Sequence, residues 1–310
     1  MRIFVKGADA GWVLDNIMND YKKHTRHKIV DIKDSPDIFW SLNLFDFPHL
    51  YTSVPKSCLS FAHIHHINET QLNEYNFDAF NKAHGCIVYN KKVEITAAKY
   101  MKIPIYRLPY WIISGTTEQI NDKNVKDLKK RIGYGGELLI GSFQKDGNGN
   151  VGDTPKISKG PDTLVEILTR LSSMTKIKVV LGGYARQYVI KKLEEKRVPY
   201  VYLPKYEDIN SLYDCLDWYF VTSRCEGGPQ AVLEASYRKI KILSTDVGVA
   251  SEILHPDCIC NGVNDFIEKV QRGIDKIDYN YNQIINNYLP SNVISKWDDF
   301  FESQYMAKNR

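Results

Sequence analysis

Residues 215–245 read CLDWYFVTSRCEGGPQAVLEASYRKIKILST, and this stretch decides the fold. Its first apolar run, residues 215–221, has the length of a buried strand, and a second run follows at 240–245. Between the runs, Gly228 can serve as the N-cap and Pro229 suits the first position of a helix. A strand, a glycine-rich turn, a helix and a second strand make up the repeating unit of a parallel α/β sheet.

The same alternation extends through the chain in both directions. Strands are predicted at residues 2–6, 28–32, 37–42, 58–64, 85–90, 103–108, 137–143, 176–183, 200–204, 217–223 and 241–245. Helices are predicted at 11–24, 69–84, 92–100, 162–173, 185–196, 207–216, in the opening stretch from Pro229, and from about 264. Parallel sheets with crossover helices explain this order.

A chain of 310 residues is long enough for two domains. Residues 115–136 are polar and end in glycines, which is typical of a linker. We therefore predict one Rossmann-like domain in residues 1–133 plus 291–310 and another in 134–290. The tail belongs to the first domain because its apolar residues at 293, 294, 297, 300 and 301 indicate a helix that packs back across it.

Composition excludes several classes of protein. Hydrophobic residues make up 43% and charged residues 25%, as in soluble globular proteins, and the net charge of +4 is too small to predict nucleic-acid binding. No window approaches 18 apolar residues, although weak attraction to a lipid surface stays open. The six scattered cysteines are predicted to be reduced, which favours a cytoplasmic location. A peripheral position at the inner face of the membrane is the open alternative.

The turn in the opening stretch combines features that suit a phosphorylated, hydroxyl-rich ligand. Glycines permit close approach to the backbone, and a helix N-terminus attracts phosphate. Glu226 lies in the turn and Glu234 within the helix, and carboxylates accept hydrogen bonds from hydroxyl groups. The alternative is a capped helix that carries two exposed glutamates.

A family resemblance favours the ligand-binding interpretation. SRCEGGPQAVLEA, followed by STDVGVASEIL, resembles the signature of retaining GT-B glycosyltransferases of the family 4 type, over roughly residues 138–256. The resemblance implies two Rossmann-like domains facing across a cleft, with the last helix crossing back to the first domain. It also implies that Glu226 binds hydroxyls of the donor sugar and that Glu234 binds the ribose. The backbone expected to line the sugar and diphosphate is that of Gly227, Gly228, Pro229 and Gln230.

Other donor contacts follow from the same resemblance. Lys159 matches the lysine that the family places before a glycine, and Lys145 takes the position of an upstream arginine; both would meet the diphosphate, although scattered lysines are often merely solvated. Gly182 and Gly183 end a strand near the nucleotide. The wall around the base is predicted at Leu203, Pro204 and Tyr206, whereas Tyr213 is expected in the core.

The first half carries the cluster SFAHIHHINE, residues 60–69. The resemblance makes His65 the residue near the reacting sugar, with His66 as the alternative, whereas His63 is expected to pack along its strand. A metal site is disfavoured because no ligand partner stands at an established spacing. Gly7 and Gly11, in the loop after the first strand, are expected to contact donor phosphate or acceptor. The stretch RLPYWI, residues 107–112, departs from the family pattern.

The sequence therefore predicts a retaining transfer of sugar from a UDP-, GDP- or ADP-sugar to a glycan, lipid-linked or protein acceptor. No cofactor or metal is expected, because lysines and a helix N-terminus would offset the charge of the departing diphosphate. A sugar-nucleotide epimerase of the same fold and an inactive nucleotide-sugar-binding homologue are the alternatives.

Overall fold

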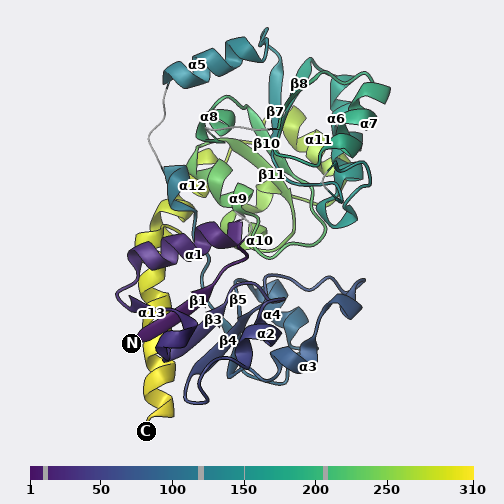
Figure 1. Ribbon diagram of the computed structural model, residues 1–310. Coiled ribbons are helices and arrows are strands. Elements are labelled where there is room, and N and C mark those ends of the chain that lie inside the picture. The colour runs from purple at the N-terminus through teal and green to yellow at the C-terminus, as the bar shows by residue number, and fades with distance from the viewer. Residues whose placement is uncertain (10–12, 118–121, 150, 205–208) are drawn as a thin grey trace. The chain divides into compact units, whose positions relative to one another are not determined.

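The computed structural model describes residues 1–9, 13–117, 122–149, 151–204 and 209–310. The chain divides into two compact units: unit 1 is Met1–Ser114 with Asn286–Arg310, and unit 2 is Gly115–Ile285. In each unit the described residues form one parallel six-stranded sheet flanked by helices (Figure 1). The predicted α/β fold with two Rossmann-like domains is confirmed at the level of these two units.

Unit 1 contains a sheet with the strand order β2-β1-β3-β4-β5-β6. The strands are β1 (Arg2–Lys6), β2 (Lys28–Ile29), β3 (Ile38–Ser41), β4 (Leu59–His63), β5 (Gly85–Val88) and β6 (Ile105–Arg107). Its helices are α1 (Val13–His24), α2 (Phe47–Tyr51), α3 (Phe77–Phe80), α4 (Lys91–Ala97) and α13 (Pro290–Lys308). The order reverses between β1 and β3, so the crevice of this sheet lies at their carboxyl ends.

The long helix predicted at 69–84 is wrong. A 3-10 turn at Leu72–Glu74 is followed by an extended Tyr75, and α3 begins anew at Phe77. The restart has a local cause, since the side chain of Asn76 accepts a hydrogen bond from the amide of Ala79 and so caps the new helix.

The two faces of the unit 1 sheet carry different covers, because neighbouring strand residues point to opposite sides. Phe39 packs in the cluster under α2, α3 and α4, whereas the next residue, Trp40, contacts Tyr21 of α1 and Trp297 of α13. Figure 1 shows α13, in yellow, crossing α1, in purple, and the two helices are in contact. The last helix therefore belongs to the first domain, as predicted.

Asp298 fastens α13 to the end of α1. Its buried carboxylate accepts hydrogen bonds from the Tyr21 hydroxyl (2.9 Å), the Thr25 hydroxyl (2.6 Å) and the Arg26 amide (3.0 Å). Three donors on one buried carboxylate fix the register of α13 on the first domain.

Unit 2 contains a sheet with the strand order β12-β11-β10-β7-β8-β9. The strands are β7 (Leu138–Ser142), β8 (Ile177–Gly182), β9 (Tyr200–Leu203), β10 (Trp218–Val221), β11 (Lys241–Thr245) and β12 (Ile259–Cys260). Counted within the unit, this is the 3-2-1-4-5-6 order of nucleotide-binding folds, which reverses between β7 and β10.

The helices of unit 2 cover both faces of its sheet. They are α5 (Asp122–Arg131), α6 (Pro161–Ser172), α7 (Gln187–Glu195), α8 (Ile209–Asp214), α9 (Gln230–Tyr237), α10 (Ala250–Ile253), α11 (Val263–Gln271) and α12 (Ile277–Asn287), the last of which ends beyond the Ile285 boundary. The main core packs α6, α7 and α11 against the strands. The segment expected to be a linker contains α5, which packs on α8.

Among the described residues, no helix combines the length and the apolar character that a membrane span requires. The six cysteines all fall within these residues and are free thiols.

We expect Asp298→Ala to destabilise the protein by about 2–4 kcal/mol, because three donors lose their buried acceptor. The neighbouring Asp299→Ala is the matched control, since Asp299 only forms an exposed ion pair with Arg26 and should cost less than about 1 kcal/mol. Urea unfolding followed by tryptophan fluorescence measures both. Equal effects of the two substitutions would contradict the assignment of Asp298.

Candidate functional site

The candidate site of unit 2 lies where β7 and β10 end. In open α/β sheets, ligands bind at the carboxyl ends of the strands at the point where the order reverses. The loop after β7, residues 143–160, and the loop after β10, residues 222–229, both leave the sheet there.

A backbone contact joins these two loops. Gly160 adopts φ 62°, and a Cβ atom at this position would lie 1.9 Å from the carbonyl oxygen of Thr222. The hydroxyl of Thr222 in turn donates to the carbonyl of Gly160 at 3.0 Å. Only glycine fits both the left-handed backbone and this approach, so the geometry of the site requires the glycine of the KGP sequence.

Further hydrogen bonds lock the loops together. The amides of Arg224 and Cys225 both donate to the carbonyl of Ser158, at 2.8 and 3.1 Å. The Arg224 guanidinium forms two parallel bonds of 2.7 Å to Asp162 in the first turn of α6. This fork-to-fork pair holds the pKa of Asp162 below its usual range.

The joined loops bring Lys159 and Glu226 into an ion pair. Both side chains are largely shielded from solvent, with exposed fractions of 22% and 11%. The hydroxyl of Ser223 also donates to Glu226 at 3.1 Å. The side-chain amide of Gln144 donates to the backbone carbonyl of Lys159 at 3.0 Å. A cation and a carboxylate, predicted separately from the sequence, thus lie side by side.

The glycine turn after Glu226 is closed by the loop that follows β11. Gly248 has φ 54°, and a Cβ atom there would lie 2.4 Å from the carbonyl of Gly227. The predicted helix start is one residue too early: Pro229, with ψ 109°, is the N-cap and α9 begins at Gln230. The extended ψ of Pro229 explains the difference and leaves Gly228 in the turn.

Glu234 of α9 is buried rather than open to solvent. Its Oε2 accepts a 2.7 Å hydrogen bond from the Tyr213 hydroxyl of α8, and burial raises the pKa of Glu234 to about 6. The Tyr213 bond opposes that rise because it stabilises the carboxylate. Tyr213 is in the core, as predicted, but its hydroxyl also holds a predicted ligand-binding carboxylate.

Lys145 and the turn after β8 lie on the other side of β7. The Lys145 ammonium sits 5.3 Å from the centre of the Tyr184 ring, and the structure therefore gives it a partner apart from the Lys159–Glu226 pair. Gly182 ends β8, and Gly183 follows with φ 78°. Leu203 ends β9 and is buried, while Tyr206 lies outside the described residues.

Arg186 is a buried residue of this edge that sequence reasoning missed. Its guanidinium donates to the carbonyls of Ser142 (2.7 Å) and Gly182 (3.2 Å) and pairs with Asp146 at 3.0 Å, with both charged side chains fully buried. Burial raises the pKa of Asp146 and the arginine opposes that shift. Arg186 thereby ties the ends of β7 and β8 to the loop that carries Lys145.

The predicted histidines of unit 1 lie at the end of β4. The Nε2 of His65 lies 2.8 Å from the carbonyl of Leu42 in the loop after β3. Burial lowers the pKa of His65 to about 4, so the ring is neutral at pH 7, with its proton on Nε2 and Nδ1 left as an acceptor. His63 packs within the sheet, as predicted, where it accepts from Trp40 and stacks on His65 at 4.4 Å; His66 is exposed.

The loop after β1 is held from within unit 1. The amides of Ala8 and Asp9 donate to Asp15 at 2.8 and 2.9 Å, and a Cβ atom on Gly7 would lie 2.4 Å from the same carboxylate oxygen. These two amide groups are therefore already bonded to an internal anion. Gly11 lies outside the described residues.

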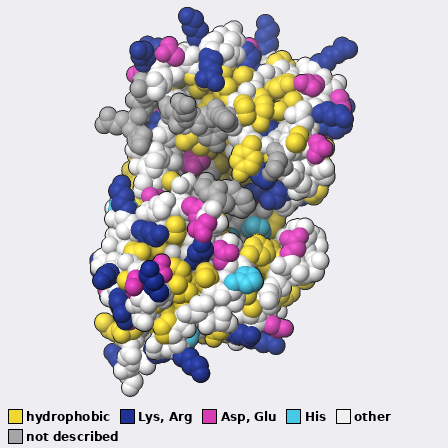
Figure 2. All heavy atoms as spheres, viewed as in Figure 1, with side chains coloured by type: hydrophobic (Ala, Val, Ile, Leu, Met, Phe, Trp, Pro, Cys, Tyr) yellow, Lys and Arg dark blue, Asp and Glu magenta, His cyan; other side chains and the backbone are white. Residues whose placement is uncertain are grey.

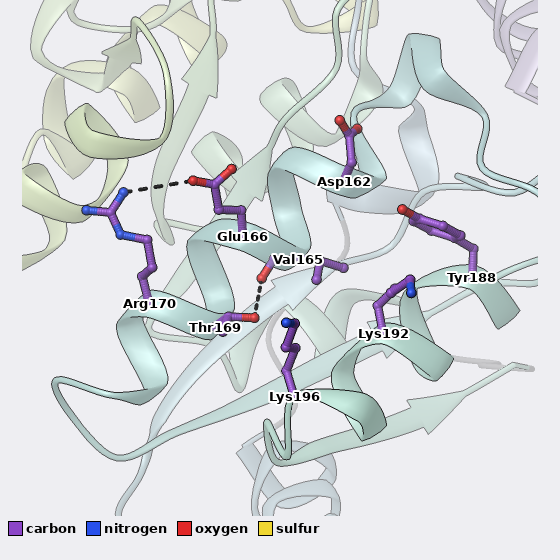
Figure 3. Close-up of a pocket in the computed structure, with 8 residues that line it drawn as sticks. All are labelled: Asp162, Val165, Glu166, Thr169, Arg170, Tyr188, Lys192 and Lys196. Atoms are coloured by element: carbon purple, nitrogen blue, oxygen red, sulfur yellow. Dashed lines mark hydrogen bonds and ion pairs between the residues drawn. The ribbon is translucent and has the colours of Figure 1, made fainter.

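Other surface features do not coincide with the predicted residues. Within the described ranges, no group of three His, Cys, Asp or Glu side chains could hold a metal ion. Figure 2 shows charges of both signs interspersed over the visible face of unit 1. A shallow groove of about 270 Å³ lies between α6 and α7 (Figure 3), lined by Asp162, Val165, Glu166, Thr169, Arg170, Tyr188, Lys192 and Lys196.

Comparisons with known proteins give a family match that includes Lys159 and Glu226 of the candidate site of unit 2. Residues 154–287 match the family model described as glycosyl transferases group 1. A search of curated protein sequences finds no match.

Solved structures of similar fold include glycosyltransferases that cover nearly the whole chain. HepE of Anabaena, in complex with UDP, is 11% identical, with a TM-score of 0.72 over 97% of this chain and 99% of its own. A glycosyltransferase of Rickettsia africae is 12% identical, with a TM-score of 0.72 over 97% of each chain. Sucrose-phosphate synthase of Thermosynechococcus elongatus is 12% identical, with a TM-score of 0.68 over 88% of this chain and 74% of its own. The fold is therefore that of GT-B glycosyltransferases.

Gly160→Ala should disrupt the junction of the two site loops. A left-handed alanine costs about 1–2 kcal/mol, and the clash with Thr222 adds roughly as much again. Gly133→Ala is the control, because Gly133 has the same φ of 62° but its Cβ would approach no atom closer than 3.8 Å. Thermal unfolding of both variants measures the difference, and equal midpoints would show that the Gly160–Thr222 contact is dispensable.

Proposed function

We propose that the protein is a retaining glycosyltransferase that transfers a sugar from a nucleoside diphosphate sugar to a carbohydrate-type acceptor. The observation that carries the proposal is the pairing of Lys159 with Glu226 where the strand order of unit 2 reverses. The glycosyl transferases group 1 match, which includes both residues, supports it.

The pair suits the two halves of a sugar phosphate. An ammonium group attracts phosphate oxygens as a compact charge, whereas a carboxylate accepts hydrogen bonds from sugar hydroxyls. Lys159 and Glu226 are adjacent, and so are the first phosphate and the sugar hydroxyls of a nucleotide sugar. The amide groups at the start of α9, beyond the Gly227-Gly228 turn, add donors for the diphosphate.

In the proposed reaction, the bond between the anomeric carbon and the diphosphate oxygen breaks. The hydroxyl oxygen of the acceptor bonds to the anomeric carbon on the face that the diphosphate leaves, and its proton passes to the departing phosphate. Lys159, joined by Lys145 when it leaves Tyr184, offsets the charge that develops on the diphosphate. These cations perform the role that a metal ion plays in other transferases, so we propose a metal-independent reaction.

His65 of unit 1 is assigned to the donor sugar. Its neutral ring presents Nδ1 as an acceptor for a sugar hydroxyl, since Nε2 is committed to Leu42. A neutral imidazole ring also does not repel the positive charge that develops on the sugar during transfer. His65 would therefore position the substrate rather than act as nucleophile or general acid.

The donor is proposed to be a UDP-sugar, with GDP- and ADP-sugars as the other candidates. Structures of HepE, similar in fold, contain UDP and UDP-glucose. We propose that residues of unit 1 select the acceptor, which is a glycan, a lipid-linked sugar or a protein. Free thiols on all six cysteines support a cytoplasmic setting. Peripheral association at the inner face of the membrane is the alternative setting.

Glu226→Gln should lower sugar transfer by about 100-fold, equivalent to about 2.7 kcal/mol, while UDP binds at least as tightly as before. The reason is that the amide no longer grips sugar hydroxyls as an anion, yet Lys159 is released to bind phosphate. Lys159→Met should weaken both UDP binding and transfer. Release of UDP from UDP-sugars and calorimetric titration with UDP measure the two effects.

Lys192→Met and Glu195→Gln are the matched controls, since this ion pair of 2.6 Å lies on the exposed side of α7. Neither control should change turnover. If the protein forms an epimeric sugar from the donor alone, its activity is epimerisation and not sugar transfer. Binding of UDP without any Glu226-dependent turnover would indicate an inactive binding homologue.

The affinity for nucleotide should rise with pH through about 6. Burial raises the pKa of Glu234 to about 6, and the ribose contact needs the carboxylate, so binding weakens as the pH falls below that value. Folding responds in the opposite sense, because a raised carboxyl pKa stabilises the folded state most at low pH and this gain is lost as the pH rises through 6. Titration of UDP between pH 5 and 8 measures the first effect. Glu234→Gln, a neutral isostere, should remove this pH dependence and leave only that of the phosphates; an unchanged profile would refute the role of Glu234.

A further inference from the structure

A line of hydrogen bonds runs from the end of β7 to Glu234. The amide of Phe143 donates to the hydroxyl of Tyr219 at 2.9 Å, and Tyr219 is hydrogen-bonded to Tyr213. The hydroxyl of Tyr213 donates to Glu234 Oε2 at 2.7 Å. Phe143 directly follows β7, and the other three residues belong to β10, α8 and α9, so the line joins the two strands that end at the candidate site to the helix that carries Glu234.

The directions of the two outer bonds follow from the groups at the ends of the line. An amide can only donate and an ionised carboxylate can only accept. The Phe143 amide therefore donates to the Tyr219 hydroxyl, and the Tyr213 hydroxyl gives its single proton to Glu234. The contact between the two tyrosine hydroxyls joins these two fixed ends.

Packing alone does not explain these two hydroxyl groups. Tyr213 and Tyr219 are exposed by only 1% and 2%, and their rings form a cluster with Phe143 in which the ring centres lie 5.0–5.2 Å apart. Phenylalanine at both positions would fill the cluster equally well. It would leave a buried carboxylate and a buried amide without these partners, which is the costly outcome inside a protein.

We propose that Tyr213 and Tyr219 are positioning residues for nucleotide binding, which hold the Glu234 carboxylate in place and link it to the residue that starts the phosphate-binding loop. The inference rests on the proposed function, in which Glu234 binds the ribose. Because Phe143 precedes Gln144 and Lys145, the line connects the ribose contact to the diphosphate contacts.

The test compares Tyr213→Phe, Tyr219→Phe and Glu234→Gln with the wild-type protein. Tyr200→Phe is the matched control: its hydroxyl also donates to a carboxylate, Glu194, at 2.6 Å, but this pair is exposed on the surface. Calorimetric titration with UDP between pH 5.5 and 8.5 gives the dissociation constants. Thermal unfolding verifies that each variant is folded.

Tyr213→Phe should weaken UDP binding about tenfold at pH 7, since a hydrogen bond to a charged group is lost. The loss of UDP affinity in this variant should grow towards low pH, because without the Tyr213 hydroxyl Glu234 is protonated more easily. Tyr219→Phe should act in the same direction but less strongly, and Tyr200→Phe should have no effect. The double variant Tyr213→Phe with Glu234→Gln should bind no more weakly than Glu234→Gln alone.

A second measurement separates this inference from the proposed function. Carbon-13 NMR of labelled glutamate side chains, with Glu234→Gln to assign the signal, follows the titration of Glu234 without any ligand. Tyr213→Phe should shift that titration to higher pH. An unshifted titration overturns the inference even if UDP binds. Additive losses of UDP affinity in the double variant overturn the inference as well. If the wild-type protein binds neither UDP, GDP nor ADP but the titration is shifted, the proposed function is overturned. The tyrosines then remain positioning residues of Glu234 alone.

Discussion

The candidate site depends on one backbone contact, that between Gly160 and the carbonyl of Thr222. It brings together two loops that are 62 residues apart along the chain. This contact places two charged side chains close together, because Lys159 precedes the glycine and Glu226 lies four residues beyond the threonine. The ion pair is thus a consequence of how closely two main chains approach, and the approach is possible because residue 160 has no Cβ.

The fold was largely predictable because parallel strands buried on both faces are short, nearly continuous apolar runs. The predictions failed where local chemistry overrides periodicity. Asn76 restarts a helix inside 69–84, and α5 forms within a polar segment because Val125 and Leu128 give it one weak apolar face. Strand β12 has only two residues, Ile259–Cys260, which is too short to register as a pattern.

Candidate site residues could be named from the sequence only where they stand at a position that a motif defines. Glu226, Glu234 and Lys159 were named from motifs that resemble those of a known family, whereas Ser223 and Gln144 contact them only because the two loops meet. In the same way, the sequence indicates that Tyr213 is a core residue without showing where its hydroxyl points. Lys145 was matched to a phosphate contact, yet its observed partner is the ring of Tyr184, an exposed residue that no pattern singled out.

Arg186 illustrates why a buried charge is informative. Removing an arginine and a carboxylate from water costs several kcal/mol, and their mutual attraction does not always repay it. The pair with Asp146 nevertheless joins two strand ends to the loop after β7 through the carbonyls of Ser142 and Gly182. Its contribution is therefore better sought in the placement of that loop than in the free energy of unfolding.

The two glutamates are prepared for a ligand in different ways. Glu226 is paired with Lys159, whereas the pKa of Glu234 is raised to about 6. This rise is a net penalty of about 2 kcal/mol on the charged form of Glu234, after one tyrosine hydroxyl has offset part of the cost of burial. In the proposed function, phosphate takes the place of Glu226 at Lys159, and sugar hydroxyls join Ser223 as donors to Glu226. A free sugar or a free phosphate would separate the ion pair and give a new partner to only one of its two charges. We therefore expect the joined molecule to bind best, because breaking a shielded ion pair is repaid only when both charges find new partners at once.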